Sequence, residues 1–245
     1  MHEQLYRMAE RNILIRSVYP QVHDYCRAYR AQGEPDFVVA VAQADLDAER
    51  RIAAREAETE GLPPRRWTDA YLEELAVYRK IAAALPAFDT ILFHGSAVAA
   101  DGVCYLFTAK SGVGKSTHTR LWRAVLGDRA VMINDDKPLL RIDNTETTVF
   151  GTPYDGKHRL SSNTSAPLGA ICLLARGETN RIRRVSAANA LPDLLRQVFR
   201  PTEPEAMRQT LALVDRLAAR TPLFRLECNP EPEAARIAYE AMRQK

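Results

Sequence analysis

The sequence predicts an α/β fold in which a mixed, hairpin-containing sheet carries a phosphate-binding loop (P-loop). The first observation is a strand-like apolar run at residues 103–108, followed by a glycine-containing loop and a segment compatible with a helix. The second is the pairing of short apolar runs around turn residues at 90–108 and 139–150, before and after the loop, which predicts hairpins. Hairpins on both sides of the loop argue against the all-parallel sheet of ordinary P-loop NTPases.

The loop itself has the residue types that a phosphate cradle requires. Gly112 and Gly114 let backbone N–H groups turn toward anionic oxygens, and the helix that follows adds the positive end of its dipole. Lys115 adds a full positive charge, and Ser116 lies where such loops place a magnesium ion. Ala109 replaces the first glycine of the strict G-x-x-x-x-G-K-[ST] pattern, which is tolerable if this residue keeps a negative φ. A chance G-K-S-T at the start of a basic helix is the alternative, and the strand–loop–helix order favours the phosphate loop. The predicted nucleotide-binding residues are Lys110, Ser111, Gly112, Val113, Gly114, Lys115, Ser116 and Thr117.

Composition is that of a soluble globular protein. The chain has 245 residues, of which 46% are hydrophobic and 27% charged, enough for one large domain with or without a smaller lobe. A net charge of +3 is too small to indicate nucleic acid as a partner. No run approaches the roughly 18 apolar residues of a membrane span, and the first residues contain no apolar signal core. The cysteines are far apart and form no C-x-x-C, so we expect buried thiols in a reducing, cytoplasmic compartment.

Two parts are expected: a small, mostly helical attachment over residues 1–85 and a P-loop domain over residues 86–245. The boundary is placed where helical spacing of apolar residues gives way to paired strands. The expected elements of the first part are a short strand at 13–15, a helix at 19–29, a buried strand at 37–41, an exposed helix at 45–60, a linker at 61–64 and a helix from Thr68 to Leu85.

The second part is expected to contain most of the strands. Its predicted elements are strands at 90–99, 103–108, 130–133, 139–142, 147–150, 167–175 and 223–226, and helices beginning near Thr117, covering 191–198 and 207–217, and beginning at Pro232. Trp122, on the helix after the loop, is expected in the core, and the basic run at 181–184 on the surface.

Two adjacent acids follow the apolar strand at 130–133 and are the strongest candidates for chemistry. A strand that ends in Asp135 and Asp136, close in sequence to the loop, is where Mg²⁺ would be held against the β and γ phosphates. Adjacent side chains on an extended strand end point to opposite sides, so one carboxylate can face the metal while the other accepts a proton as general base. The competing interpretation is that Asn-Asp-Asp only begins a turn. His94, at another strand end, is a second candidate, although a lone histidine there is more often structural.

The irregular segment at 151–162 also has the character of a site. Lys157, His158 and Arg159 place three cations in succession in a loop kept irregular by glycine and proline. Such a loop could clamp the transferred phosphate or an anionic acceptor, with Lys157 and Arg159 as the clamp residues. A solvated basic loop is an equally good explanation.

Taken together, the segment from His94 to Ala175 resembles the catalytic core of HPr kinase/phosphorylase. The similarity rests on His94-Gly95, the hairpin, the Ala-Lys-Ser-Gly-Val-Gly-Lys-Ser loop and the strand that ends in Asp-Asp. More distantly, the order is similar to that of ATP-dependent phosphoenolpyruvate carboxykinase. The family's metal-site glutamate has no counterpart in the segment at 151–160, where Asp155 is the nearest substitute.

The resemblance implies a role for each matching residue. Lys115 would bind the β and γ phosphates, Thr117 a phosphate oxygen, and His94 would line the acceptor side. One aspartate would be the catalytic base and the other a metal ligand. We assign Asp135 as the base, and Asp136 with Ser116 as the metal ligands.

Three functions were weighed. The first is an ATP- and Mg²⁺-dependent kinase that phosphorylates a hydroxyl, on a peptide serine or on a small alcohol. The second is a nucleotide-binding regulatory module without phosphotransfer, which would not need both aspartates near the phosphates. The third, a carboxykinase-type lyase, is disfavoured by the short chain and the lack of a second anion-binding lobe. The kinase is expected. The sequence does not identify the acceptor, the choice between ATP and GTP, or a reverse phosphorylase activity. It also leaves two roles open for residues 1–85, which could cover the acceptor side or mediate assembly into a homo-oligomer.

Overall fold

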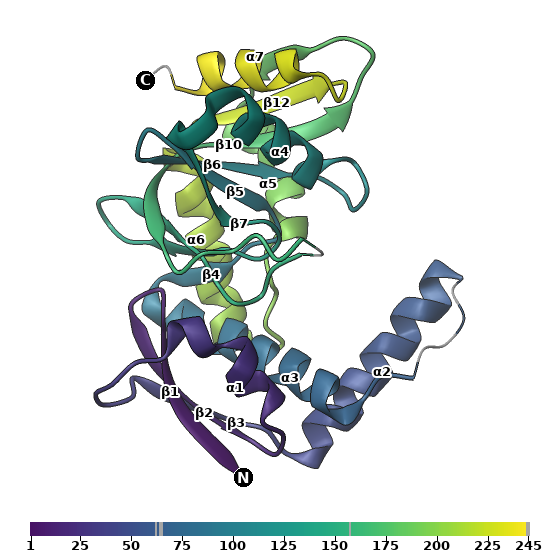
Figure 1. Cartoon of the computed structure of the whole chain (residues 1–245), viewed down its shortest axis with the longest axis vertical. Coiled ribbons are helices and arrows are strands. Elements are labelled where there is room, and N and C mark those ends of the chain that lie inside the picture. The colour runs from purple at the N-terminus through teal and green to yellow at the C-terminus, as the bar shows by residue number, and fades with distance from the viewer. Residues whose placement is uncertain (62, 64–65, 157, 244–245) are drawn as a thin grey trace. The chain divides into compact units, whose positions relative to one another are not determined.

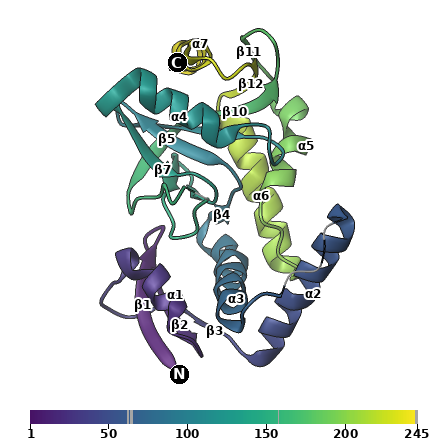
Figure 2. The same cartoon turned by 45° about the vertical axis from the view of Figure 1, so that its right-hand side comes forward.

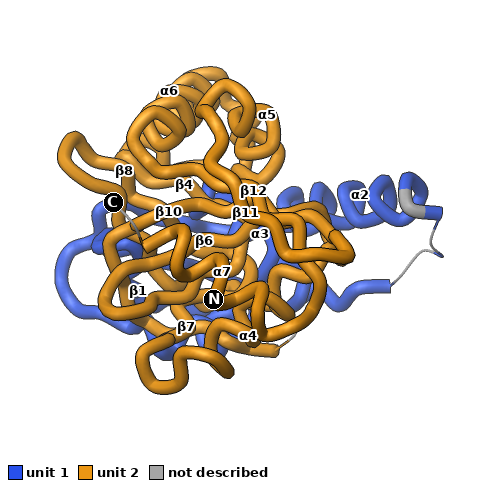
Figure 3. Tube along the Cα trace, turned by 90° about the horizontal axis from the view of Figure 1, so that it is seen from above, with its two compact units in different colours: residues 1–82 blue, residues 83–245 orange. Residues whose placement is uncertain are grey.

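The computed structural model describes residues 1–61, 63, 66–156 and 158–243. The chain divides into two compact units, Met1–Ala82 and Ala83–Lys245 (Figure 3). The division falls inside helix α3 (Asp69–Ala84), close to the boundary that the sequence pattern suggests. No helix among the described residues combines the length and apolar content that a membrane span needs.

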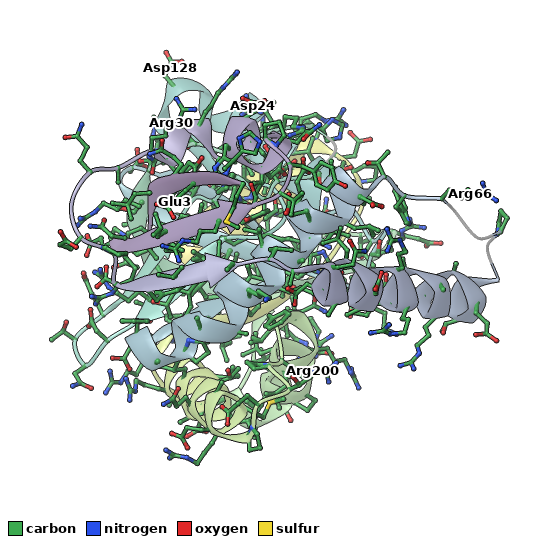
Figure 4. All side chains as sticks on the ribbon, turned by 90° about the horizontal axis from the view of Figure 1, so that it is seen from below. Glu3, Asp24, Arg30, Arg66, Asp128 and Arg200 are labelled. Atoms are coloured by element: carbon green, nitrogen blue, oxygen red, sulfur yellow. The ribbon has the colours of Figure 1, made fainter. Side chains whose placement is uncertain are left out.

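The first unit contains a three-stranded sheet in the order β1-β2-β3, with β1 antiparallel and β3 parallel to β2. Glu3 on β1, which is labelled in Figure 4, accepts a hydrogen bond from Arg16 Nε on β2 at 2.5 Å. Its other elements are helices and one 3₁₀ turn (Figure 1). The elements are β1 (His2–Met8), β2 (Arg11–Ser17), α1 (Gln21–Tyr25), η1 (Arg27–Tyr29), β3 (Phe37–Ala40), α2 (Gln43–Glu60) and α3.

Two sequence expectations for this unit need correction. Strand β1 was not expected, because its polar residues interrupt any strict alternation and only its last residues are buried. The strand expected to be buried at 37–41 is an edge strand that pairs with β2 alone, and Val38 on it is 47% exposed. The expected exposed helix at 45–60 is present as α2, in which Leu46 and Glu49 are the buried residues among positions 43–59. The expected linker at 61–64 lies partly outside the described residues.

The second unit is built on a nine-stranded mixed sheet whose main path runs β4-β8-β9-β10-β6-β5-β7, with β12 beside β10 and β11 beside β12. Strand β10 pairs antiparallel with β9 at its start and runs parallel to both β6 and β12 further on. The hairpins β5–β6 and β8–β9 are both present. The predicted mixed, hairpin-containing α/β sheet is therefore confirmed. The strands are β4 (Thr90–Leu92), β5 (Ser96–Ala100), β6 (Val103–Thr108), β7 (Ala130–Asn134), β8 (Leu139–Ile142), β9 (Thr147–Phe150), β10 (Ser165–Arg176), β11 (Arg181–Arg184) and β12 (Leu223–Cys228).

Helices cover both faces of this sheet (Figure 2). Residues of β6 alternate between the two cores, so that Leu106 packs with α5 and α6 while Phe107 packs with α4 and α7. Trp122 on α4 is fully buried in the second of these cores, as expected. All four cysteines are free thiols. The helices are η2 (Leu85–Phe88), α4 (Lys115–Leu126), η3 (Gly127–Arg129), α5 (Ala187–Gln197), α6 (Pro204–Arg220) and α7 (Pro232–Met242).

The segment at 90–99 was expected to be one strand and is two. Strand β4 pairs with β8, whereas β5 pairs with β6 and β7. The strand conformation is interrupted between β4 and β5 at His94-Gly95. Gly95 passes so close to β6 that an added Cβ would lie 3.0 Å from the Phe107 carbonyl oxygen. Its N–H donates to the Asp136 carbonyl oxygen at 2.9 Å. The break therefore brings His94 beside the end of β7.

Candidate functional site

The segment between β6 and α4 has the conformation of a tight loop that opens a helix. Gly112 has φ 78° and Gly114 has φ 125°, backbone angles that residues with a side chain rarely adopt. Ala109 is not among the described residues with positive φ, which explains why alanine is accepted at the position of the first motif glycine. The loop therefore ends at Gly114, the N-cap of α4, and Lys115 is the first residue of the helix.

Lys115 folds back over the loop. Its Nζ donates to the Ala109 carbonyl oxygen at 3.2 Å. Burial lowers the pKa of Lys115, and the nearby carboxylate of Asp136 acts in the opposite direction. A half-buried ammonium group with only a carbonyl partner can exchange that partner for a phosphate oxygen.

One cleft of about 560 Å³ brings together side chains from four segments of the chain. It is lined by His94, Ser111, Gly112, Gly114, Lys115, Ser116, Thr117, Asp135, Asp136, Gly156 and His158. Lys110 and Val113, also expected to bind nucleotide, line neighbouring cavities instead. Arg159 is not among the described lining residues, and Lys157 lies outside the described residues. The basic loop thus contributes His158 to the cleft.

Asp135 is the most unusual group in the cleft. The residue is only 3% exposed, and its Oδ1 accepts a hydrogen bond from the Gly156 N–H at 2.7 Å. Its Oδ2 is buried and has no hydrogen-bond partner in the described part of the chain. Burial raises the pKa of Asp135, and the charges of Asp155 and Asp136 add to the effect. An unpaired buried carboxylate oxygen is costly, so this atom is set up to receive a proton or a ligand.

Asp136 differs from Asp135 because both of its carboxylate oxygens lie near basic side chains. Its Oδ1 lies 3.2 Å from His94 Nε2 and its Oδ2 lies 3.3 Å from Lys137 Nζ. Burial alone would raise the pKa of Asp136, but the contacts with His94 and Lys137 outweigh it and the pKa is lowered. Two neighbouring carboxylates therefore differ in character, one suited to accept a proton and one that stays ionised.

Asn134 fixes the turn that carries both acids. Its Oδ1 accepts hydrogen bonds from the Asp136 N–H at 2.8 Å and the Lys137 N–H at 2.6 Å. Its Nδ2 donates to the Thr152 carbonyl oxygen at 3.1 Å. The turn-forming role weighed for Asn-Asp-Asp therefore belongs to Asn134, which leaves both carboxylates directed into the cleft.

His94 connects Asp136 to helix α5. Its Nδ1 lies 3.0 Å from Gln197 Oε1, while its main-chain N–H donates to the Gln197 carbonyl oxygen at 2.6 Å. Thr108 Oγ1 at the end of β6 donates to the His94 carbonyl oxygen at 3.0 Å. The histidine is thus fixed from both sides and positions Asp136.

The sequence did not predict the contacts of Gln197 and Gly156. The turn at Asn134 was among its interpretations, because an asparagine directly before an acidic pair is suited to cap a turn. Gln197 gave no signal, since it lies 103 positions from His94 in the chain. Gly156 is needed because an added Cβ would lie 2.9 Å from Asp135 Oδ2, a requirement that appears only once the fold is known.

The donor set of the cleft suits magnesium better than a cation that is enclosed by protein. No group of three or more His, Cys, Asp or Glu side chains within the described ranges could hold a metal ion. Mg²⁺ keeps several waters and commonly takes only one or two carboxylates together with substrate phosphates. The Ser116 hydroxyl and the Asp136 carboxylate line the cleft and would fit such a set, and Asp135 Oδ2 is buried beside them without a hydrogen-bond partner in the described chain.

Comparison with solved structures finds a distant likeness. The structure is similar to that of the Hpr(Ser) kinase/phosphatase from Coxiella burnetii, at 12% sequence identity and a TM-score of 0.34, over 62% of this chain and 97% of that chain. No protein-family model matches the sequence, and no curated protein is significantly similar to it. Similarity at this level assigns neither a family nor an activity to the chain.

A second cavity of about 380 Å³ adjoins the cleft and shares Gly112, Gly114 and Thr117 with it. His118, which lines this cavity, is 3% exposed and accepts a hydrogen bond from Trp122 Nε1 through its own Nε2 at 3.0 Å. Burial lowers the pKa of His118 to about 4, so the neutral ring carries its hydrogen on Nδ1. This Nδ1 is buried without a hydrogen-bond partner in the described chain. His118, in the wall of the second cavity, therefore has an Nδ1–H donor that makes no hydrogen bond in the described chain.

Replacing Gly156 with alanine is expected to destabilise the second unit by about 1 kcal/mol, because the new methyl group would press on the Asp135 carboxylate. The free energy of unfolding, measured with denaturant, checks this. In an Asp135→Ala background the same substitution should cost almost nothing, since no carboxylate is left to displace. An equal cost in both backgrounds would show that the methyl group acts on something else.

Proposed function

We propose that this chain is an ATP- and Mg²⁺-dependent kinase that transfers the γ-phosphate to a hydroxyl group, on a peptide serine or on a small alcohol. The observation that carries the proposal is the placing of Asp135, with its raised pKa and unpaired Oδ2, in the same cleft as Lys115 and Ser116. Phosphoryl transfer asks a protein to offset charge, to align donor and acceptor, and to accept a proton. The cleft offers a group for each task.

The start of α4 would bind the phosphates. Lys115 gives up its hydrogen bond to Ala109 and contacts the β and γ phosphate oxygens, while Thr117 contacts a further phosphate oxygen. Ser116 and Asp136 would hold Mg²⁺, which when bound offsets the charge on the β and γ phosphates. Asp136 suits this role because its lowered pKa keeps it ionised.

Asp135 would act as the general base. The acceptor oxygen forms a bond to the γ-phosphorus, the bond from that phosphorus to the bridging oxygen of ADP breaks, and the hydroxyl proton passes to Asp135 Oδ2. A carboxylate whose pKa is raised by burial accepts a proton more readily than an exposed one. The Gly156 N–H holds the other oxygen, so the reactive oxygen has a fixed direction.

The cavity next to the cleft would take the nucleoside. Because it shares three loop residues with the cleft, a nucleotide can place its sugar and base there while its phosphates reach Lys115. Leu121 and Pro230 give it apolar walls for a purine ring. The buried His118 Nδ1–H offers a hydrogen bond to a ring nitrogen or a sugar oxygen.

The proposal is tested by an acceptor screen with γ-labelled ATP and Mg²⁺, covering small alcohols and serine peptides. We expect label to appear on a hydroxyl acceptor with the natural chain, to require Mg²⁺, and to disappear in Asp135→Asn. A chain that binds ATP, labels no acceptor, and binds ATP equally well after Asp135→Asn would be a nucleotide-binding regulatory module. Release of phosphate to water would not count as transfer, so the acceptor itself must be recovered with label.

A further inference from the structure

A third cavity, of about 350 Å³, lies beside the start of the loop and shares none of its lining residues with the catalytic cleft. It is enclosed by the end of β6, the end of β10, the last turn of α5 and one residue of β12. Its lining residues are Thr108, Ala109, Lys110, Val113, Leu173, Leu174, Ala175, Arg176, Asp193, Arg196, Gln197 and Arg225.

The charged side chains that line this cavity are mostly cationic. Four cationic side chains line it against the single carboxylate of Asp193. That carboxylate is already shared, because it accepts from Arg196 at 3.1 Å and from Arg225 at 2.8 Å. Lys110 is exposed, and its side-chain ammonium group has no hydrogen bond or ion pair with any described residue. The cavity therefore has unused positive charge.

The rest of the wall is apolar. Leu173, Leu174 and Val113 face the same space as the cations. The guanidinium groups of the cavity already have partners, since Arg176 donates to the Gly112 carbonyl oxygen at 2.6 Å, but their charge exceeds that of Asp193. Apolar walls beside this excess positive charge and the Lys110 ammonium group suit an anion with an apolar body, because both parts of such a molecule are satisfied at once. A phosphate ion alone would leave the apolar wall unused.

The last turn of α5 connects this cavity to the catalytic cleft. Gln197 lines the cavity, and its side chain and carbonyl oxygen both contact His94. His94 Nε2 in turn lies 3.2 Å from Asp136 Oδ1. A molecule that shifts the end of α5 would therefore shift the contact that holds Asp136.

We propose that this cavity binds a small anion with an apolar body, such as a carboxylate or a phosphate monoester, and that the bound anion changes nucleotide affinity through Gln197 and His94. The ligand is an effector and is not phosphorylated there, since Asp193 is engaged by two arginines and offers no free base. The effect on nucleotide rests on the proposed function, whereas the binding of the anion does not.

Binding is tested with phenyl phosphate, using calorimetry without nucleotide. We expect the double variant Lys110→Gln/Arg196→Gln to raise the Kd at least about tenfold, because two charge-assisted contacts are lost. Lys115→Ala and the surface control Arg208→Gln should leave the Kd unchanged, and uncharged phenol should not bind. Equal affinity in the double variant, or loss of binding in Lys115→Ala, would overturn the site, the second by showing that the probe occupies the phosphate loop.

Coupling is tested by measuring the Kd of Mg²⁺–ATP with and without saturating phenyl phosphate. We expect a change of about fivefold in the natural chain, within the usual range of coupling between sites. Gln197→Met should still bind phenyl phosphate but should lose this change, because it cannot hydrogen-bond to His94. Phenyl phosphate that binds the natural chain without altering nucleotide affinity would overturn the effector role. A chain that binds phenyl phosphate and transfers no phosphate would contradict the kinase proposal alone.

Discussion

Replacing Lys115 with alanine is expected to lower kcat/KM for the proposed phosphotransfer by about 10³-fold, because the cleft loses the positive charge that would offset the γ-phosphate in the transition state. The fold should be unchanged. Lys115 makes a single hydrogen bond in the described structure, to the Ala109 carbonyl oxygen, and alanine is the best helix former for the first position of α4. Transfer to the acceptor found in the screen, together with thermal unfolding, measures both parts.

A matched control lies on the same helix. Arg120 on α4 is exposed, and Arg120→Ala removes the same charge outside the cleft. This variant should keep the turnover of the natural chain. If both variants lost activity equally, the effect would come from the overall charge of α4. If Lys115→Ala kept full activity, Lys115 would have no part in binding phosphate.

Replacing Asp135 with asparagine is expected to remove phosphotransfer, by about 10²–10⁴-fold, and at the same time to stabilise the protein. The folded state raises the pKa of Asp135, so its ionised form is disfavoured in the fold at neutral pH. Asparagine removes that charge, while its amide oxygen can still accept the Gly156 N–H. The melting temperature of the variant should therefore exceed that of the natural chain at pH 7. The difference should shrink as the pH falls through the raised pKa, because Asp135 then becomes neutral by itself.

The neighbouring acid provides the opposite control. The pKa of Asp136 is lowered, so its ionised form stabilises the fold above its unfolded pKa, and this contribution is lost as the pH falls through the folded value. Asp136→Asn should accordingly lower the melting temperature at pH 7, since the contacts with His94 and Lys137 lose their charge. A stabilising Asp136→Asn, or an Asp135→Asn that unfolds more easily, would reverse the assignment of the two carboxylates.

Local order along the chain explains which site residues the sequence could predict. Lys115 and Ser116 follow the glycine-containing loop after β6, and Asp135 comes directly after the short apolar strand β7, so the neighbours of each candidate residue mark it in the sequence. The break at His94-Gly95 and the role of Gln197 depend on contacts between distant segments. Glycine is needed at position 95 because the chain passes close to β6 there. The sequence around residue 95 does not indicate this close approach.

The edges of the sheets were harder to predict than the centre. The apolar strand β10 was expected and is present, whereas β11, a basic run expected only to be surface, pairs with β12. Its Arg183 and Arg184 are exposed, so the run carries no apolar alternation. Pairing with a neighbour, not burial, makes it a strand.

Strand β10 also has a consequence for how the protein is made. It joins β9, β6 and β12, so the strand that leads into the phosphate loop has its parallel neighbour only after residue 165 has been synthesised. A growing chain that already contains the loop and both aspartates still exposes one edge of β6. The candidate cleft is therefore completed late in synthesis. A truncated chain that ends before β10 would contain every proposed phosphate-binding and catalytic residue without the parallel strand that pairs with β6.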